Sequence, residues 1–368
     1  MRKIYAIFLL LLAQNIAHAQ LTEMPNGGNK KAMVSERIGI TDVTVHYDRP
    51  GVKGREGKIW GGLVPYGYSD QGFGTSKAAP WRAGANENTT IEFTDDVMVE
   101  GQSLSAGKYG FFIAPGASEC TLIFSKNSTS WGSFFYNAAE DVLRVKVKPV
   151  VMDKSTEWLT YSFENQTPNS ADITLTWEKW KIPFKVQVDV QKTQLASFRR
   201  ELRSDKGFRW EAWVQATQYC IDNNINLEEA MQWADYAING QFIGQKNFQT
   251  LSTKAQLLNK LNRNTEADAI MKEALPMGDM NDLHNYGKQL LTSKRYKEAF
   301  DVFKMNYDKR PDKFTTNVGL ARGYSAIGNY KEALKYAQAA LPQAPDASNK
   351  TNLQSMIERL KAGKDIND

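Results

Sequence analysis

The feature that most constrains the fold is a repeat in the last third of the chain. The block Tyr296-Lys297-Glu298-Ala299 recurs 34 residues later as Tyr330-Lys331-Glu332-Ala333, and Pro311 recurs as Pro345 at the same interval. A 34-residue period is typical of stacked helical hairpins, in which each hairpin buries one face against the next. The rear of the chain is therefore predicted to be a helical-repeat array.

Four glutamate–alanine pairs mark the predicted second helices of the hairpins, at intervals of 37, 32 and 34 residues: Glu229-Ala230, Glu266-Ala267, Glu298-Ala299 and Glu332-Ala333. An alanine allows two helices to approach closely, so we expect these alanines to be buried at the helix crossings. The pattern predicts an all-α repeat domain over residues 209–368, with a closing helix from Ala347. A polar connecting helix is predicted over residues 191–208.

The front half has a different period. Apolar and polar residues alternate from Val34 to about Val190, as in Val43, Val45 and Tyr47, which is typical of strands with one buried face. The expected strands are 43–47, 89–94, 107–114, 119–125, 143–147, 157–165, 173–177 and 182–190. Such a succession predicts an all-β sandwich or jelly-roll-like domain over residues 20–190. The predicted fold class is thus mixed, with two domains.

The first nineteen residues have the pattern of a secretory signal. Arg2 and Lys3 precede an apolar run from Ile4 to Ala13, and Ala17-His18-Ala19 supplies small residues for cleavage. The run is too short to span a bilayer, and no later segment is long and apolar enough to do so. We therefore expect an exported protein, periplasmic or extracellular, without a membrane span.

Charge and composition argue against several classes of function. The net charge of +5 falls to +3 when the signal and its two basic residues are removed, which is too small a bias to predict nucleic-acid binding. Cys120 and Cys220 fall in different predicted domains and are expected to be buried free thiols. His46 and His284 are also separated, so no metal site and no cofactor are expected.

Residues 50–88 interrupt the strands with nine glycines and three prolines. A loop of this length inside a compact domain is often functional. Its end combines an indole, a guanidinium, amides and a carboxylate, and its beginning is basic. The candidate ligand-binding residues are Trp81, Arg82, Asn86, Glu87, Asn88, Arg49, Lys53 and Arg55.

Two interpretations of this loop stay open. An arginine fork and a flat indole could hold a small sugar or an anion. Alternatively, the polar groups form a network that pins the loop onto the sandwich, and the basic residues are solvated. An enzymatic alternative pairs Glu87 with Asp95 or Asp96, as in a glycoside hydrolase. His46 is expected on the outer face of its strand, where it would not serve a catalytic triad.

The helical half resembles the tetratricopeptide repeat family. Small residues and their partners match its first helix in three repeats: Ala255 with Leu258, Gly287 with Leu290, and Ala321 with Tyr324. Gly328-Asn329-Tyr330 matches the turn between helices, whereas Gln218 departs from the pattern in the first repeat.

This resemblance implies that the first helices face the concave side of the stack. The partner groove would then be lined by Gln249, Ser252, Gln256, Asn281, His284, Lys288, Thr315 and Arg322. A polar and mildly basic groove suits an extended or acidic peptide. Ser252 and Gln256 replace the lysine and asparagine of the family's clamp for a terminal carboxylate, so that clamp is not expected; a solvated face without a ligand is the alternative.

The front half resembles the bacterial family DUF 2911 over roughly residues 24–190. The segments that carry this resemblance are Met24-Pro25-Asn26-Gly27-Gly28-Asn29-Lys30, Arg49-Pro50-Gly51-Val52-Lys53-Gly54-Arg55, Trp60-Gly61-Gly62-Leu63-Val64-Pro65 and Pro80-Trp81-Arg82-Ala83-Gly84-Ala85-Asn86-Glu87. It implies a fold and an exported setting, but no activity.

These observations predict an exported, non-enzymatic binding or adaptor protein. Its β domain recognises something, and its helical repeats dock a protein or peptide partner. The alternative is a carbohydrate-directed hydrolase or a sugar-binding protein that uses the region from Trp81 to Asp96.

Overall fold

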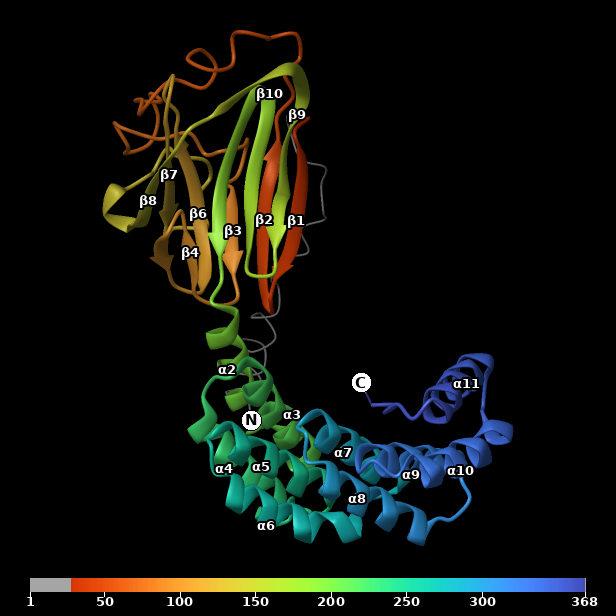
Figure 1. Ribbon diagram of the computed structural model, residues 1–368. Coiled ribbons are helices and arrows are strands. Elements are labelled where there is room, and N and C mark those ends of the chain that lie inside the picture. The colour runs from red at the N-terminus through yellow and green to blue at the C-terminus, as the bar shows by residue number, and fades with distance from the viewer. Residues whose placement is uncertain (1–27, 368) are drawn as a thin grey trace, which may run out of the picture. The chain divides into compact units, whose positions relative to one another are not determined.

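The computed structural model describes residues 28–367 and divides the chain into two compact units (Figure 1). The first unit ends at Ala196 and the second begins at Ser197. The predicted signal over residues 1–19 lies outside the described residues. Among residues 28–367, no helix has the length and apolar character needed to cross a membrane.

The first unit consists of two antiparallel sheets. The larger has the order β1 (Lys30–Ile38), β2 (Thr41–Arg49), β3 (Thr90–Phe93), β6 (Gly107–Ala114), β7 (Cys120–Ser125) and β8 (Asp141–Val147). The smaller has the order β5 (Gln102–Leu104), β4 (Val97–Val99), β10 (Ser170–Gln187) and β9 (Val150–Thr167). The prediction of a β domain followed by helices is confirmed.

Alternation along the strands fills one core between the sheets. Val43 and Val45 are fully buried, while His46 between Val45 and Tyr47 is exposed, as expected for the outer face. The ring centres of Phe111 and Phe124, which face each other across the β6–β7 pair, are 5.2 Å apart. Burial of such large rings is the main stabilisation of a sandwich core.

The strand prediction differs from the structure in three respects. The strands expected at 173–177 and 182–190 form one continuous strand, β10, which ends at Gln187. Val190 instead begins helix α2, because the Asp189 carboxylate accepts the Lys192 N–H and turns the chain into a helix. Strands β1, β4 and β5 were not among the expected strands. Strands β4 and β5 have only three residues each, which is too short to show a period, whereas the polar and charged residues of β1 obscure its alternation.

The second unit contains four antiparallel helical hairpins and a closing helix, and the boundary between the units falls within helix α2. The pairs are α3 (Trp210–Asn223) with α4 (Leu227–Asn239), α5 (Phe248–Lys260) with α6 (Asn264–Ala274), α7 (Met280–Thr292) with α8 (Tyr296–Lys309), and α9 (Phe314–Ala326) with α10 (Tyr330–Ala340). Helix α2 (Val190–Glu201) precedes them, and α11 (Ala347–Lys361) follows.

Small residues occupy the helix crossings, as predicted. The repeated alanines of the second helices are completely buried: Ala230, Ala237, Ala267, Ala274, Ala299, Ala333 and Ala340 all have an exposed fraction of 0%. A Cβ atom added at Gly287 of α7 would lie 2.5 Å from the Phe303 ring of α8, and one at Gly319 of α9 would lie 2.8 Å from the same ring. The close approach of three helices around Phe303 therefore depends on these two glycines.

Candidate functional site

The glycine-rich loop over residues 50–88 lies at the end of the sandwich opposite the exit into α2 (Figure 1, orange). Two of the candidate arginines anchor its beginning. Arg49 donates to the Leu159 carbonyl of β9 at 2.8 Å, and Arg55 donates to the carbonyls of Val52 and Gly51. Arg49 therefore links the start of the loop to strand β9, and Arg55 stabilises the turn of its own loop.

A cavity of about 650 Å³ opens under this loop, and we call it the tryptophan pocket. It brings together five of the eight candidate residues, with a sixth side chain from β10 that the sequence did not suggest: Lys53, Arg55, Trp81, Arg82, Asn86 and Trp177. A cavity of this size is in the ordinary range of small-molecule sites.

Four tryptophans form one cluster, and two of them, Trp81 and Trp177, line the pocket. The rings of Trp81 and Trp177 are stacked at 5.9 Å, and those of Trp60 and Trp180 at 4.6 Å. The Trp81 indole N–H donates to the Gly84 carbonyl at 3.1 Å, which fixes the ring. The pocket thus has a rigid aromatic surface.

A bulge in β10 explains why sequence reasoning missed this cluster. Trp177 and Trp180 are three residues apart and would point to opposite faces of a regular strand. The register shifts on both sides of Glu178, whose φ is 52°, so both indoles are buried on the core side. Glu178 is itself buried and accepts the Gly57 N–H at 3.2 Å, which ties the loop to the bulge.

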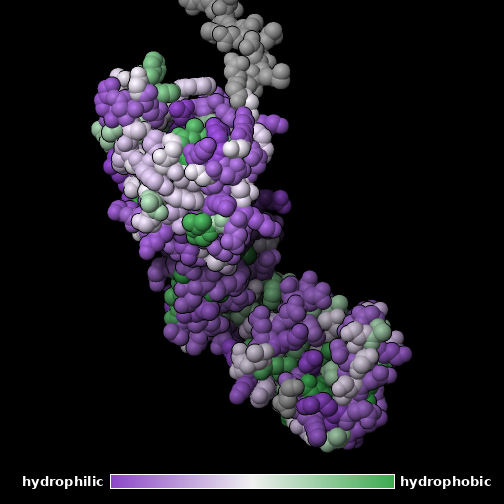
Figure 2. Space-filling view, turned by 90° about the horizontal axis from the view of Figure 1, so that it is seen from above, coloured by the Kyte–Doolittle hydropathy of each residue, from purple (hydrophilic) through white to green (hydrophobic). Residues whose placement is uncertain are grey.

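Exposed aromatic and apolar residues continue on the loop around the pocket. Tyr66 and Phe73 have exposed fractions of 45% and 64%, and Tyr66 stacks on Trp180 at 6.3 Å. Viewed from this end, the sandwich shows pale and green residues among the purple ones (Figure 2). The loop end is therefore less hydrophilic than most of the visible surface.

Arg82 is the central cation of the tryptophan pocket. Its Nη1 donates to the Asn86 carbonyl at 2.8 Å, and its guanidinium carbon lies 5.0 Å from the centre of the Phe134 ring. Burial lowers the pKa of Arg82, and no carboxylate among the described residues pairs with it. The expected polar network is thus present here, but the guanidinium keeps unused donors.

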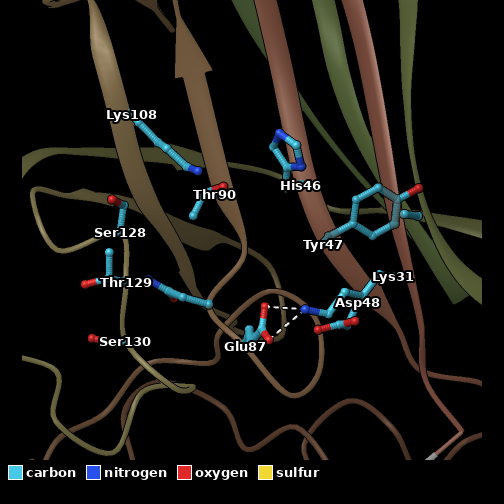
Figure 3. Close-up of a pocket in the computed structure, with 12 residues that line it drawn as sticks. Lys31, His46, Tyr47, Asp48, Glu87, Thr90, Lys108, Ser128, Thr129 and Ser130 are labelled. Atoms are coloured by element: carbon cyan, nitrogen blue, oxygen red, sulfur yellow. Dashed lines mark hydrogen bonds and ion pairs between the residues drawn. The ribbon is translucent and has the colours of Figure 1, made fainter. Parts of the chain in front are cut away.

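The other two loop candidates line a different, smaller cavity of about 290 Å³, which we call the polar hollow (Figure 3). Glu87 points to the Lys31 ammonium from β1, and the two groups form an ion pair at 2.7 Å. Asn88 is buried and donates to the Asn127 carbonyl at 3.1 Å. The eight candidates therefore divide between two cavities and the framework.

A second carboxyl lies beside this ion pair. Asp48 of β2 is only 3% exposed, and desolvation raises its pKa, although the Glu87 backbone N–H and the Lys31 ammonium oppose that shift. Asp48 and Glu87 thus both line the polar hollow, where Glu87 is held in its ion pair with Lys31.

The structure does not favour the predicted pairing of Glu87 with Asp95 or Asp96. Glu87 precedes strand β3 and the two aspartates follow it, and the three carboxylates have different partners. Asp95 accepts a hydrogen bond from Thr41 at 3.0 Å, and Asp96 pairs with Lys192 at 3.7 Å. The hydrolase alternative therefore loses the carboxylate pair on which it depended.

Within the described part of the chain, no cluster of three or more histidine, cysteine, aspartate or glutamate side chains could hold a metal ion. Both cysteines are free and buried, and burial raises the pKa of the Cys220 thiol to about 11. Neither thiol has the character of a reactive nucleophile.

In the helical unit, the eight groove candidates lie on the first helices α5, α7 and α9. Gln256 of α5 lines a shallow hollow of about 470 Å³ together with Ile221 of α3 and Gln289 of α7. Of the eight candidates, only Gln256 lines this hollow, and all eight are exposed or half-buried. We call the eight candidate residues on α5, α7 and α9 the first-helix surface.

His284 of α7 is half-buried, and its ring contacts the core of its hairpin. Its ring lies 5.7 Å from that of Phe303, and desolvation lowers its pKa to about 4, helped by the nearby cations Lys288 and Arg322. A hydrogen bond with the Thr315 backbone opposes the shift. The structure therefore brings four of the candidates together around a neutral imidazole.

The last residues of the chain lie against α9, which the sequence did not suggest. Ser325 donates to the Asp365 carboxylate at 2.7 Å and accepts the Ile366 N–H at 3.1 Å. The Asn367 amide donates to the Arg322 carbonyl at 3.0 Å. Ile366 is only 7% exposed and belongs to the core of the last hairpin and α11.

Comparison with known families agrees with the division into two parts. Residues 29–186 match the family described as protein of unknown function (DUF2911). The resemblance predicted for the front half is therefore confirmed, and no activity comes with it. No curated protein matches the sequence.

Several solved structures are similar to the chain at low identity. YrrB, described as a TPR protein with an unusual peptide-binding site, is 18% identical, with a TM-score of 0.31, over 45% of this chain and 83% of its own. MamA from Desulfovibrio magneticus RS-1 is 15% identical, with a TM-score of 0.29, over 42% and 93%. A thermophilic TPR protein from Thermus thermophilus is 16% identical, with a TM-score of 0.30, over 45% and 90%. The repeat architecture follows from the helical hairpins themselves.

Proposed function

We propose that this protein is an exported adaptor that acts by binding and not by catalysis. Its helical repeats dock an extended segment of a protein or peptide partner on the first-helix surface. Stacked hairpins present such a continuous surface because each repeat contributes one helix to it. The polar side chains of α5, α7 and α9 supply donors and acceptors along its length.

The observation that supports the proposal most strongly is the contact of the C-terminal segment with α9. Ser325 and Arg322 hold the residues from Asp365 to Asn367 through hydrogen bonds to side chains and to the backbone. An irregular segment is thus accommodated on a first helix by groups of the kind that peptide recognition requires.

The charge of the surface favours an acidic partner segment. Lys288 on α7 is exposed, and Arg322 on α9 lies in the same cluster around His284. The acidic Asp365 of the chain's own tail lies close enough to Arg322 to raise its pKa, against the larger lowering by burial. Complementary charge of this kind steers a partner and speeds its association.

The test uses the mature chain with one charge reversed. Lys288→Glu should weaken the capture of acidic partners by about tenfold, because it turns attraction into repulsion on the docking surface. The matched control is Lys331→Glu on α10, a second helix, where the lysine is also exposed. Partners would be captured by cross-linking in the organism's own envelope fraction. Equal capture by the wild-type chain and Lys288→Glu, or no partner beyond those held by a chain ending near Val190, would contradict the proposal.

Export is also part of the proposal and rests on the pattern of residues 1–19. Sequencing of the N-terminus of the protein from a periplasmic or culture fraction should give Gln20 as the first residue. Recovery of the intact N-terminus in the cytoplasm would contradict export.

A further inference from the structure

The tryptophan pocket has an unbalanced charge. Lys53, Arg55 and Arg82 line it, and none of them forms an ion pair with a carboxylate of residues 28–367. Asp70 is the only carboxylate in the lining, and Lys77 already pairs with it at 3.2 Å. Glu157 lies nearby, outside the lining, where it accepts the Lys53 backbone N–H at 3.0 Å. The cavity is therefore cationic.

The position of Arg82 makes this imbalance costly. Its guanidinium lies over the Phe134 ring, and Gly132 packs so closely that an added Cβ would be 2.4 Å from Nη1. Arg82 is half-buried, and a cation that is withdrawn from water without a counter-charge loses hydration without compensation. An anion in the cavity would supply that compensation, and the planar fork of arginine suits a carboxylate or phosphate group.

The same cavity offers an apolar surface beside the charges. Trp81 and Trp177 line it together with Val64 and Pro65. Because Trp81 is fixed by its hydrogen bond to Gly84 and by stacking on Trp177, the apolar face of a ring can lie against it at little entropic cost. The polar hollow lacks this apolar surface, because no tryptophan lines it, and one of its two lysines, Lys31, is already paired with Glu87.

We propose that the tryptophan pocket binds a small organic anion, whose carboxylate or phosphate group contacts Arg82 and Lys53 and whose ring lies against Trp81. This site is independent of the docking surface proposed for the helical unit. The proposed role is binding, because Asp70, the only carboxylate among the described lining residues, is already paired with Lys77.

The experiment compares three probes that share one ring. D-glucuronate and D-glucose 6-phosphate carry the two anionic groups, and D-glucose is the neutral match. We expect at least one anion to change the tryptophan fluorescence of the mature chain and to raise its Tm, at matched ionic strength, while glucose does neither. The anion that acts distinguishes a carboxylate ligand from a phosphate ligand. No response to either anion up to about 10 mM, or an equal response to glucose, would overturn the proposal.

Variants assign the response to the pocket. Lys53→Gln should weaken anion binding by about tenfold, the effect of losing one charge-assisted hydrogen bond. Lys58→Gln is the control, because Lys58 is an exposed lysine of the same loop that does not line the pocket. Arg82→Lys keeps the charge but loses the fork, and should weaken binding without removing it. Unchanged binding by Lys53→Gln and Arg82→Lys, in chains with wild-type circular dichroism, would also overturn the proposal.

Discussion

The two units of this protein solve the problem of filling a core in opposite ways. Of the twelve largest side chains that are completely buried, eleven lie in the sandwich and only Phe303 lies in the helical unit. The helical unit instead brings helices together over alanines with no exposed surface. The stability of the sandwich should therefore be most sensitive to substitutions that make a buried side chain smaller. The stability of the repeats should be most sensitive to substitutions that make a buried side chain larger.

The largest effect is expected from Trp177→Ala in the sandwich. The ring is 1% exposed and stacks on Trp81, so its removal leaves a cavity and should cost about 3–5 kcal/mol of unfolding free energy. Urea denaturation together with hydrogen exchange would localise the loss to β10 and the loop. Trp131→Ala is the control, because that ring is 58% exposed. Equal losses of unfolding free energy in the two variants would contradict the claim that the sandwich depends on its large buried side chains.

Gly287→Val tests the helical unit by adding volume. The new Cβ would meet the Phe303 ring at 2.5 Å, and we expect a loss of about 3 kcal/mol with faster hydrogen exchange in α7, α8 and α9. Ala269→Val adds the same branched side chain at an exposed position of α6 and should cost only about 0.5 kcal/mol. A Gly287→Val chain as stable as Ala269→Val would show that the crossings are not tightly packed.

An effect of similar size, visible as a dependence on pH, concerns His284. Its pKa is about 4 in the folded protein, against an ordinary value of 6.5, so the unfolded chain takes up a proton at higher pH. The ring's contribution to stability is present above pH 6.5 and is lost as the pH falls towards 4, by about 3 kcal/mol. The measurement is the unfolding free energy at several pH values. His284→Gln should flatten the curve in this window, whereas His46→Gln, on the outer sandwich face, should leave it unchanged.

Particular residues show how far the sequence alone could lead. The 34-residue period located the hairpins, and the repeated alanines are buried where the period placed them. The strand period located seven of the ten strands, and the change of period near Val190 marked the start of α2. These features were accessible because each depends on residues a few positions apart in the chain.

The candidate site was accessible only in part. Lys53, Arg55, Trp81, Arg82 and Asn86 belong to one loop and share the tryptophan pocket. Glu87 turns away to Lys31, a partner 56 residues earlier, and Arg49 serves β9. Trp177 was missed because a bulge, and not the strand period, decides its direction.

The sequence by itself determined which local structures form. The spacing of apolar residues distinguishes helices from strands, small residues mark the helix crossings, and glycines mark the turns. The tertiary structure alone decided which charges remain without partners, since that depends on groups distant in the chain. It left the cations of the tryptophan pocket unpaired, neutralised Lys31 with Glu87, and placed Asp365 against Ser325 of α9.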